Sequence, residues 1–115
     1  MDTYGLLLPK EYILSFTEVQ QVSSRIFRQE VNGDFGIIHD PFTGIFNDYT
    51  LTAVVNKEVD AKMLPNIMSV SGMLYGTVVF CRLEPGNKRL MGLTNFQIAY
   101  LKRIKKLFLY SEHVS

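Results

Sequence analysis

A nearly continuous apolar run over residues 74–83 is the feature that most constrains the fold. The run is rich in the β-branched and aromatic residues typical of strands, and both of its alternating faces are apolar. A strand of this kind must be covered on both faces, so we expect it at the centre of a sheet. The turn residues 84–87 end it.

A helix-start pattern follows this strand. Thr94 and Gln97 have the spacing of a capping box, in which the threonine hydroxyl accepts from the glutamine backbone N–H and the glutamine side chain reaches back. Leu93 and Ile98 have the spacing of a hydrophobic staple. We therefore expect a helix from residue 95 to about residue 108, with apolar residues along one side and cations along the other.

The N-terminal part carries similar signals. A short strand is expected within residues 5–14, entered from a proline-containing segment. Ser15 and Glu18 match a second capping box, and apolar residues then recur every three or four positions. This pattern predicts a helix over residues 16–30 that ends at Asn32.

The middle of the chain reads as strands and turns. Residues 35–39 predict a short strand, and turn residues lead from it into residues 45–55, whose alternation predicts one face on a core and the other in water. Residues 56–70 are expected to form a loop with one helical turn at most, because a proline discourages continuation of a helix. Residues 88–92 fit either a short edge strand or a loop.

The order of these elements predicts the fold class. With 115 residues, 47% of them hydrophobic and no linker-like stretch, the chain has the size and composition of one domain with a buried core. We predict a single α+β domain over residues 1–115. Its sheet is antiparallel or mixed with four to five strands, and two helices pack on one face.

The sequence also bears on the compartment. Cys81 is the one cysteine, which excludes an internal disulfide framework and fits a reducing environment. The first residues lack the basic region and long apolar stretch of a signal peptide. No apolar run approaches the roughly 20 residues that span a bilayer. We therefore expect a cytoplasmic protein that does not enter a membrane.

Positive charge is concentrated at the C-terminal end. Residues 1–87 contain six Lys or Arg against ten Asp or Glu, whereas residues 88–115 contain six against one. Clustered cations can neutralise phosphates. The other interpretation is a solvated helix face whose cations complement the helix dipole, and the near-neutral net charge of +1 favours it. The candidate nucleic-acid or partner-binding residues are Lys88, Arg89, Lys102, Arg103 and Lys106.

Adaptable apolar side chains gather in the least regular part of the sequence. Methionine suits surfaces that must re-pack against a partner, although it fills gaps in cores equally well. If residues 56–70 form a surface loop, an apolar partner-binding patch follows. Its candidate residues are Met63, Leu64, Ile67 and Met68.

No catalytic arrangement emerges from the residue pattern. Cys81 lies inside the apolar run, and the side chain of Arg82 next to it should point to the opposite face, so an inert buried thiol is expected. His39, Asp40 and Asp48 match no metal-site spacing. The glycines form no phosphate-binding loop. We predict no catalytic residue, no cofactor and no metal, and hence a protein that is not an enzyme.

Two functions fit these observations. The leading prediction is a small interaction or accessory protein that acts by protein–protein binding, and the alternative is a nucleic-acid-binding module that uses the basic C-terminal helix. A homodimer is also expected, because residues 35–39 carry few charges and would be poorly guarded at the edge of a sheet.

Three segments follow Asn56 in order: Leu64-Pro65-Asn66, YGTVVF at residues 75–80, and LTNFQI at residues 93–98. This order, over about residues 51–104, resembles small uncharacterised proteins encoded by phages, plasmids and conjugative elements. Those proteins have no assigned activity, so the resemblance implies no functional residue. It implies an accessory protein in a bacterial cytoplasm that acts on host machinery.

Overall fold

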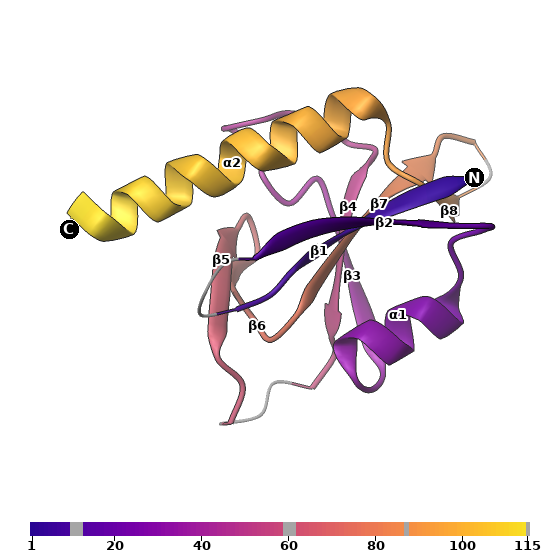
Figure 1. The fold of residues 1–115 in the computed structure, drawn as a ribbon, viewed down its shortest axis with the longest axis horizontal. Coiled ribbons are helices and arrows are strands. Elements are labelled where there is room, and N and C mark those ends of the chain that lie inside the picture. The colour runs from indigo at the N-terminus through magenta and orange to yellow at the C-terminus, as the bar shows by residue number, and fades with distance from the viewer. Residues whose placement is uncertain (10–12, 59–61, 87, 115) are drawn as a thin grey trace.

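The computed structural model describes residues 1–9, 13–58, 62–86 and 88–114, with the backbone alone from residue 107 on. Within these residues the chain forms eight strands and two helices, which are labelled in Figure 1. The elements are β1 Asp2–Leu7, β2 Leu14–Val19, α1 Ser24–Val31, β3 Phe35–His39, β4 Leu51–Asn56, β5 Pro65–Ser69, β6 Gly72–Tyr75, β7 Val78–Glu84, β8 Arg89–Met91 and α2 Asn95–Val114.

A mostly antiparallel sheet confirms the predicted α+β class. Its strands lie in the order β2-β1-β7-β4-β3, and β8 pairs with β7 beyond the end of β1. Strand β7 is central, as the apolar run predicted, although the run is interrupted at Gly76, whose φ of 75° turns the chain. Residues before this turn belong to β6, which pairs with β5 in a separate two-stranded sheet.

The two helices pack on opposite faces of the sheet, not on one face as expected. Val78 and Phe80 lie in the cluster that contains the buried side chains of α2. Val79 and Cys81 lie in the other cluster, with Phe27 of α1. The physical reason lies in β7 itself, because a strand with two apolar faces needs a covering layer on each. Figure 1 shows α2 above the sheet and α1 below it.

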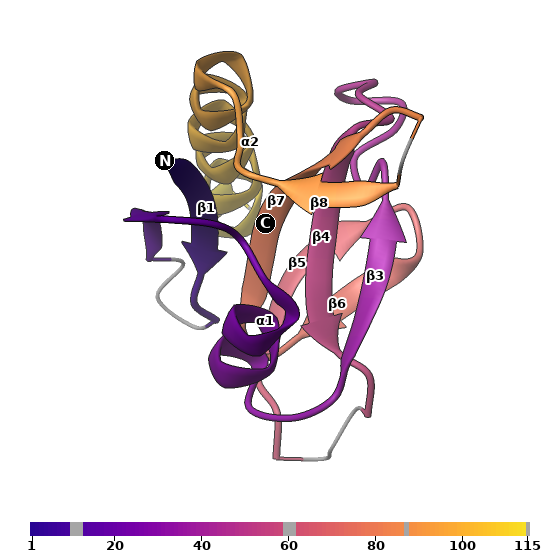
Figure 2. The ribbon, with the colours of Figure 1, turned by 90° about the vertical axis from the view of Figure 1, so that its right-hand side faces the viewer.

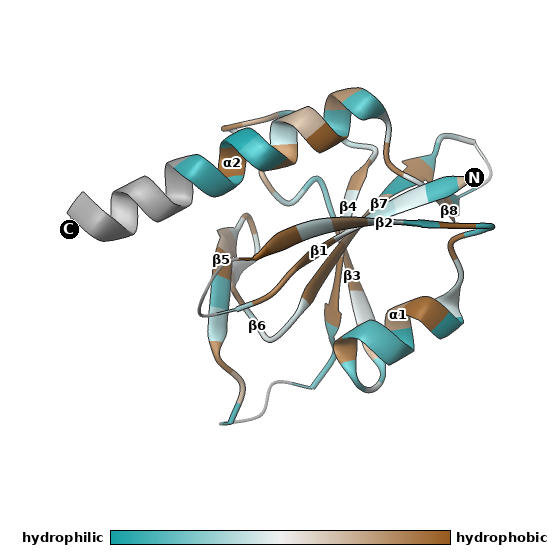
Figure 3. Ribbon diagram, viewed as in Figure 1, coloured by the Kyte–Doolittle hydropathy of each residue, from teal (hydrophilic) through white to brown (hydrophobic). Residues whose placement is uncertain are grey.

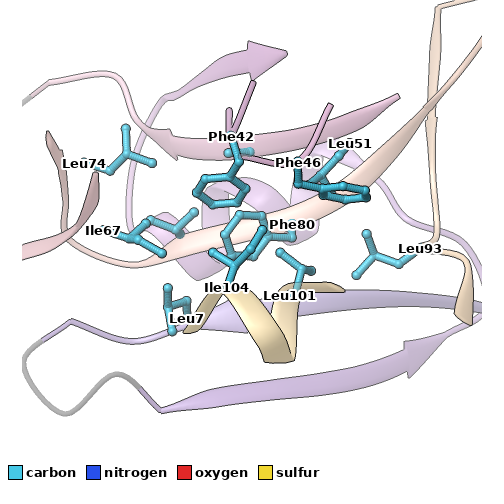
Figure 4. Packing of buried hydrophobic residues seen from close by; sticks show 12 residues of the cluster. Leu7, Phe42, Phe46, Leu51, Ile67, Leu74, Phe80, Leu93, Leu101 and Ile104 are labelled. Carbon is cyan, nitrogen blue, oxygen red and sulfur yellow. The ribbon is translucent and has the colours of Figure 1, made fainter. Parts of the chain in front are cut away.

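The core on the α2 face joins segments from the whole chain. Phe80 lies at its centre, beside Leu7 of β1 and the helix residues Leu101 and Ile104 (Figure 4). All four side chains are at most 3% exposed. Figure 3 shows hydrophilic and hydrophobic stretches alternating along α2, as expected of a helix with one buried side.

The predicted helix over residues 16–30 is wrong in its first half. Residues 14–19 form β2, which pairs with all six residues of β1, and Ser15 lies opposite Leu6 in that pairing instead of capping a helix. Residues 24–31 form α1, which ends at Asn32 in the left-handed conformation, as predicted. Tertiary pairing with β1 therefore overrides the local helix signal.

The predicted hairpin of β3 and β4 is confirmed, but its second strand begins later than expected. The chain turns over residues 40–50, and β4 begins at Leu51. The alternation predicted for residues 45–55 placed Thr52 on the water-facing side, but Thr52 is fully buried. Both faces of β4 are covered, since Ala53 packs in the cluster on the α2 face and Val54 in the cluster with α1. The predicted loop over residues 56–70 is also corrected, since it contains β5.

Candidate functional site

The outer face of the β5–β6 hairpin carries several exposed apolar side chains. Pro65 lies opposite Tyr75, and Met68 lies opposite Met73. Residues directly opposite in an antiparallel pair share a face, so these four side chains form one surface. Met68 is 48% exposed, Met73 37% and Tyr75 36%. We call these four residues the hairpin face.

The predicted apolar patch is reproduced in part. Met68 belongs to the hairpin face, and Leu64 precedes it with an exposed side chain. Ile67 is only 3% exposed and lies in the core, which corrects its predicted role, because the register of β5 shifts between Pro65 and Met68 and the two residues between them both point inward. Met63 is half-buried and lines a small polar hollow with Asn32.

Sequence reasoning missed Met73 and Tyr75. Tyr75 was assigned to the predicted central strand over residues 74–83, in which it would have been covered, and Met73, just before that strand, was left out of the predicted patch. The Gly72–Tyr75 bounds of β6 and the turn at Gly76 place them on the hairpin instead. The signal that could have found them is Gly76 itself, because a glycine inside a strand pattern often marks a break.

The hairpin is fixed to the rest of the domain through Asn66. Its side chain is 2% exposed, and its Nδ2 donates to the carbonyl oxygens of Leu7, at 2.9 Å, and Gly76, at 2.8 Å. The turn of the hairpin is held by a hydrogen bond of 2.8 Å from the Val70 N–H to the Pro41 carbonyl. The hairpin face is therefore presented on an ordered support.

A second candidate surface is a hollow between β2 and α2. Leu14 and Phe16 of β2 and the helix residues Lys102, Lys105 and Lys106 line an open space of about 450 Å³. The Nζ of Lys102 lies 5.7 Å from the ring centroid of Phe16, within the range of a cation–π contact. We call this hollow the lysine groove.

The structure separates the predicted basic residues into two places. Lys102, Arg103 and Lys106 are exposed on α2, as expected. Lys88 and Arg89 are also exposed, but they lie at the start of β8. Lys88 lines another hollow, of about 430 Å³, with the side chains Ile37, His39, Leu83 and Leu90.

Lys105, which the sequence pattern placed both among the basic residues of the helix and along its apolar side, is half-buried and lines the lysine groove. Arg103 does not line the groove. The groove therefore takes three lysines from two neighbouring turns of α2 and leaves the arginine outside.

The start of α2 is a buried polar network that sequence reasoning found in part. The Thr94 hydroxyl accepts from the Gln97 N–H at 3.1 Å, and Gln97 Oε1 accepts from the Thr94 N–H at 3.0 Å, which confirms the capping box. Gln97 Nε2 also donates to Asp48 Oδ2 at 2.9 Å and to Thr50 Oγ1 at 3.1 Å. The network joins α2 to the loop before β4.

The network also acts on the charge of Asp48. Burial alone would raise the pKa of this carboxyl group, but hydrogen bonds from Thr50, Gln97 and the backbone outweigh it. The pKa of Asp48 therefore lies below its usual value, and the carboxylate stays ionised. These bonds have structural roles, and they leave the carboxylate engaged on both oxygens.

Cys81 is a structural residue. Its side chain is fully buried, and burial raises the pKa of the thiol to about 12. A thiol that stays protonated and out of reach of solvent does not act as a nucleophile. Within the described ranges, no three His, Cys, Asp or Glu side chains gather as a metal site would require.

Strand β3 lies at the edge of the sheet, as the dimer prediction assumed (Figure 2). The Asp40 N–H donates to the Leu51 carbonyl and the Lys57 N–H to the Asp34 carbonyl, so even-numbered residues of β3 face β4. Phe35, Ile37 and His39 therefore direct their backbone groups away from the sheet. Dimer formation through this edge stays a prediction.

Compared with known proteins, the chain matches no protein-family model, no curated protein and no solved structure. Neither helix, over the residues that the structure describes, is long and apolar enough to cross a membrane.

Proposed function

We propose that this chain is a non-enzymatic interaction protein that binds a protein partner through the hairpin face. The observation that carries the proposal is the exposure of Met68 and Met73, directly opposite one another on an ordered hairpin. Methionine side chains adapt their shape to a partner, and aromatic rings such as that of Tyr75 are enriched where interfaces are tightest. An accessory role in a bacterial cytoplasm, on host machinery, and a homodimer through β3 belong to the same proposal.

Changing both methionines to lysine should remove partner binding. Met68→Lys with Met73→Lys places two charges at the centre of the hairpin face, and a charge buried without a counterion at an interface weakens binding by about tenfold or more. Affinity capture and crosslinking from the source organism should recover a defined protein with the natural chain and lose it with this variant.

The matched control is Tyr49→Lys. Tyr49 is 71% exposed and lies in the loop before β4, outside both the hairpin face and β3. The control should keep the partner. Equal recovery with both variants, or turnover found in a broad metabolite screen, would contradict the proposal.

Nucleic-acid binding remains the second candidate, favoured by the exposure of Lys102, Arg103 and Lys106 on one helix. If these cations contact phosphates, affinity should fall with salt, with a log–log slope of about −0.9 for each duplex phosphate neutralised. Changing all three to glutamate should abolish binding without unfolding the domain. Fluorescence anisotropy with mixed-sequence DNA and RNA measures both effects, and absent or salt-insensitive binding eliminates this candidate.

A further inference from the structure

The pairing of β2 with β1 shows which residues of β2 direct their backbone N–H and C=O groups toward the outer edge of the sheet. The Leu8 N–H donates to the Ile13 carbonyl at 2.9 Å, and β2 pairs with β1 in continuous register from there. Hydrogen-bonded pairs alternate along an antiparallel ladder, so Ser15 and Thr17 face β1. The N–H and C=O groups of Leu14, Phe16 and Glu18 therefore point away from the sheet.

The side chains of this edge lie under the helix. Leu14 and Phe16 pack against the cluster on the α2 face, and both line the lysine groove. A strand added to the edge of β2 would place the residues opposite Leu14 and Phe16 on that same face, because directly opposite residues share a face. Every second side chain of such a strand would enter the groove.

The groove offers positive charge to whatever enters it. Lys102, Lys105 and Lys106 converge on it. Among the described side chains, these three lysines form no ion pair with a carboxylate, and the Lys102 head group lies over the Phe16 ring. The charge is therefore available to a ligand.

From these observations we propose that the β2–α2 edge binds an extended acidic segment of a protein by strand addition. The backbone of the segment pairs with Leu14 and Phe16, and carboxylates on alternate residues point at the lysines. Main-chain hydrogen bonds supply affinity in this mode of recognition, and pockets for alternate side chains supply specificity. This surface is separate from the hairpin face, so the inference goes beyond the function proposed above and adds a second binding surface with a stated class of partner.

The neighbouring charges refine the expected sequence of the segment. Glu18 follows Phe16 on the same face of β2 and is exposed. A carboxylate opposite Glu18 would meet a like charge, so the acidic residues belong opposite Leu14 and Phe16 and a neutral or basic residue opposite Glu18. A single nucleic-acid strand fits less well, because Phe16 is the one aromatic ring in the described lining and the edge groups match a peptide backbone.

Peptide titration with charge-reversed variants tests the proposal. A short fluorescein-labelled peptide that carries two glutamates and then one lysine at alternate positions, with threonine between them, should bind the full chain. A peptide of equal composition with its glutamates adjacent should bind more weakly. Lys102→Glu and Lys106→Glu should each weaken binding of the alternating peptide by about tenfold, which is about 1.4 kcal/mol. Arg103→Glu is the matched control on the same helix and should change the affinity by less than about twofold, since its side chain lies outside the groove.

Amide hydrogen exchange supplies a second measurement, because a loose ionic contact would not slow the exchange of the β2 amides. On peptide binding, the Phe16 and Glu18 amides should exchange at least about tenfold more slowly, whereas Ser15 and Thr17, already bonded to β1, should change little. The proposal is overturned by absent binding, by equal weakening with Arg103→Glu, by unchanged Phe16 exchange, or by oligonucleotide binding in place of peptide binding. Loss of the hairpin-face partner leaves this result untouched, because the Met68 and Met73 variants keep the groove intact.

Discussion

Replacing Gln97 by alanine should lower the free energy of unfolding by about 2–4 kcal/mol, because a buried polar group left without its partner costs about 1–3 kcal/mol. The Gln97 side chain is 2% exposed and makes three hydrogen bonds. Its loss leaves the Thr94 N–H without a cap and removes a donor from Asp48 and from Thr50. Chemical denaturation of the purified chain measures the effect.

Asn95→Ala is the matched control for this substitution. Asn95 lies two residues earlier in the same helical turn, and its side chain is exposed. Its replacement should change stability by less than about 0.5 kcal/mol, as is usual for surface positions. Equal losses for the two variants would show that the network around Asp48 contributes nothing.

Gln97→Ala should also reduce the dependence of stability on pH. The folded-state pKa of Asp48 is lowered, so its contribution is present above the unfolded value of about 3.9 and is lost as the pH falls through the folded pKa. Without the Gln97 donor, the folded pKa of Asp48 moves back toward the unfolded value. The natural chain should therefore lose more stability than Gln97→Ala between about pH 5 and pH 3.

Replacing Gly92 by alanine should destabilise the domain by about 3 kcal/mol, the upper range for overpacking a well-packed site. A Cβ atom at this position would lie 2.6 Å from the Thr3 nitrogen and 2.8 Å from the Asp2 Cα. Both are backbone atoms, which cannot rotate away as a side chain can. The Leu93 N–H donates to the Thr3 carbonyl at 2.7 Å beside this contact, so relief of the clash would also strain the junction of β1 and β8.

Gly36→Ala gives the comparison for a strand glycine without a clash. The nearest atom to its added Cβ is the Lys57 Cα at 4.0 Å, an ordinary contact distance. This variant should lie within about 1 kcal/mol of the natural chain, because a compatible glycine-to-alanine change acts mainly on the unfolded state. Thermal or denaturant unfolding of the two variants side by side decides the matter, and equal midpoints would refute the predicted clash.

The parts of the fold that sequence predicted correctly are those with local causes. The capping box of Thr94 and Gln97 closes within four residues, and the apolar run of β7 must be buried whatever lies around it. Ser15 and Glu18 carry the same capping signal, yet the structure places them in β2. The deciding partner there is β1, whose pairing with β2 is not written in either segment alone.

The candidate sites show the same limit. Exposure of Lys102, Arg103 and Lys106 follows from helical periodicity, which is local. Lys102 and Lys106 line the lysine groove and Arg103 does not. This difference depends on Phe16, a residue from the opposite end of the chain, because Phe16 lies beneath Lys102 and not beneath Arg103. Long-range placement of this kind was beyond the reach of pattern reasoning.

The position of β7 has a consequence for synthesis on the ribosome. This strand pairs with β1 on one side and with β4 on the other, and so joins the β1–β2 and β3–β4 hairpins. A chain emerges N-terminal end first, so both hairpins leave the ribosome before the strand that unites them. Until then each hairpin exposes an open inner edge, which is a template for unwanted pairing. The nascent chain should therefore depend on chaperones or rapid elongation, and any message truncated ahead of residue 78 should yield an aggregating product.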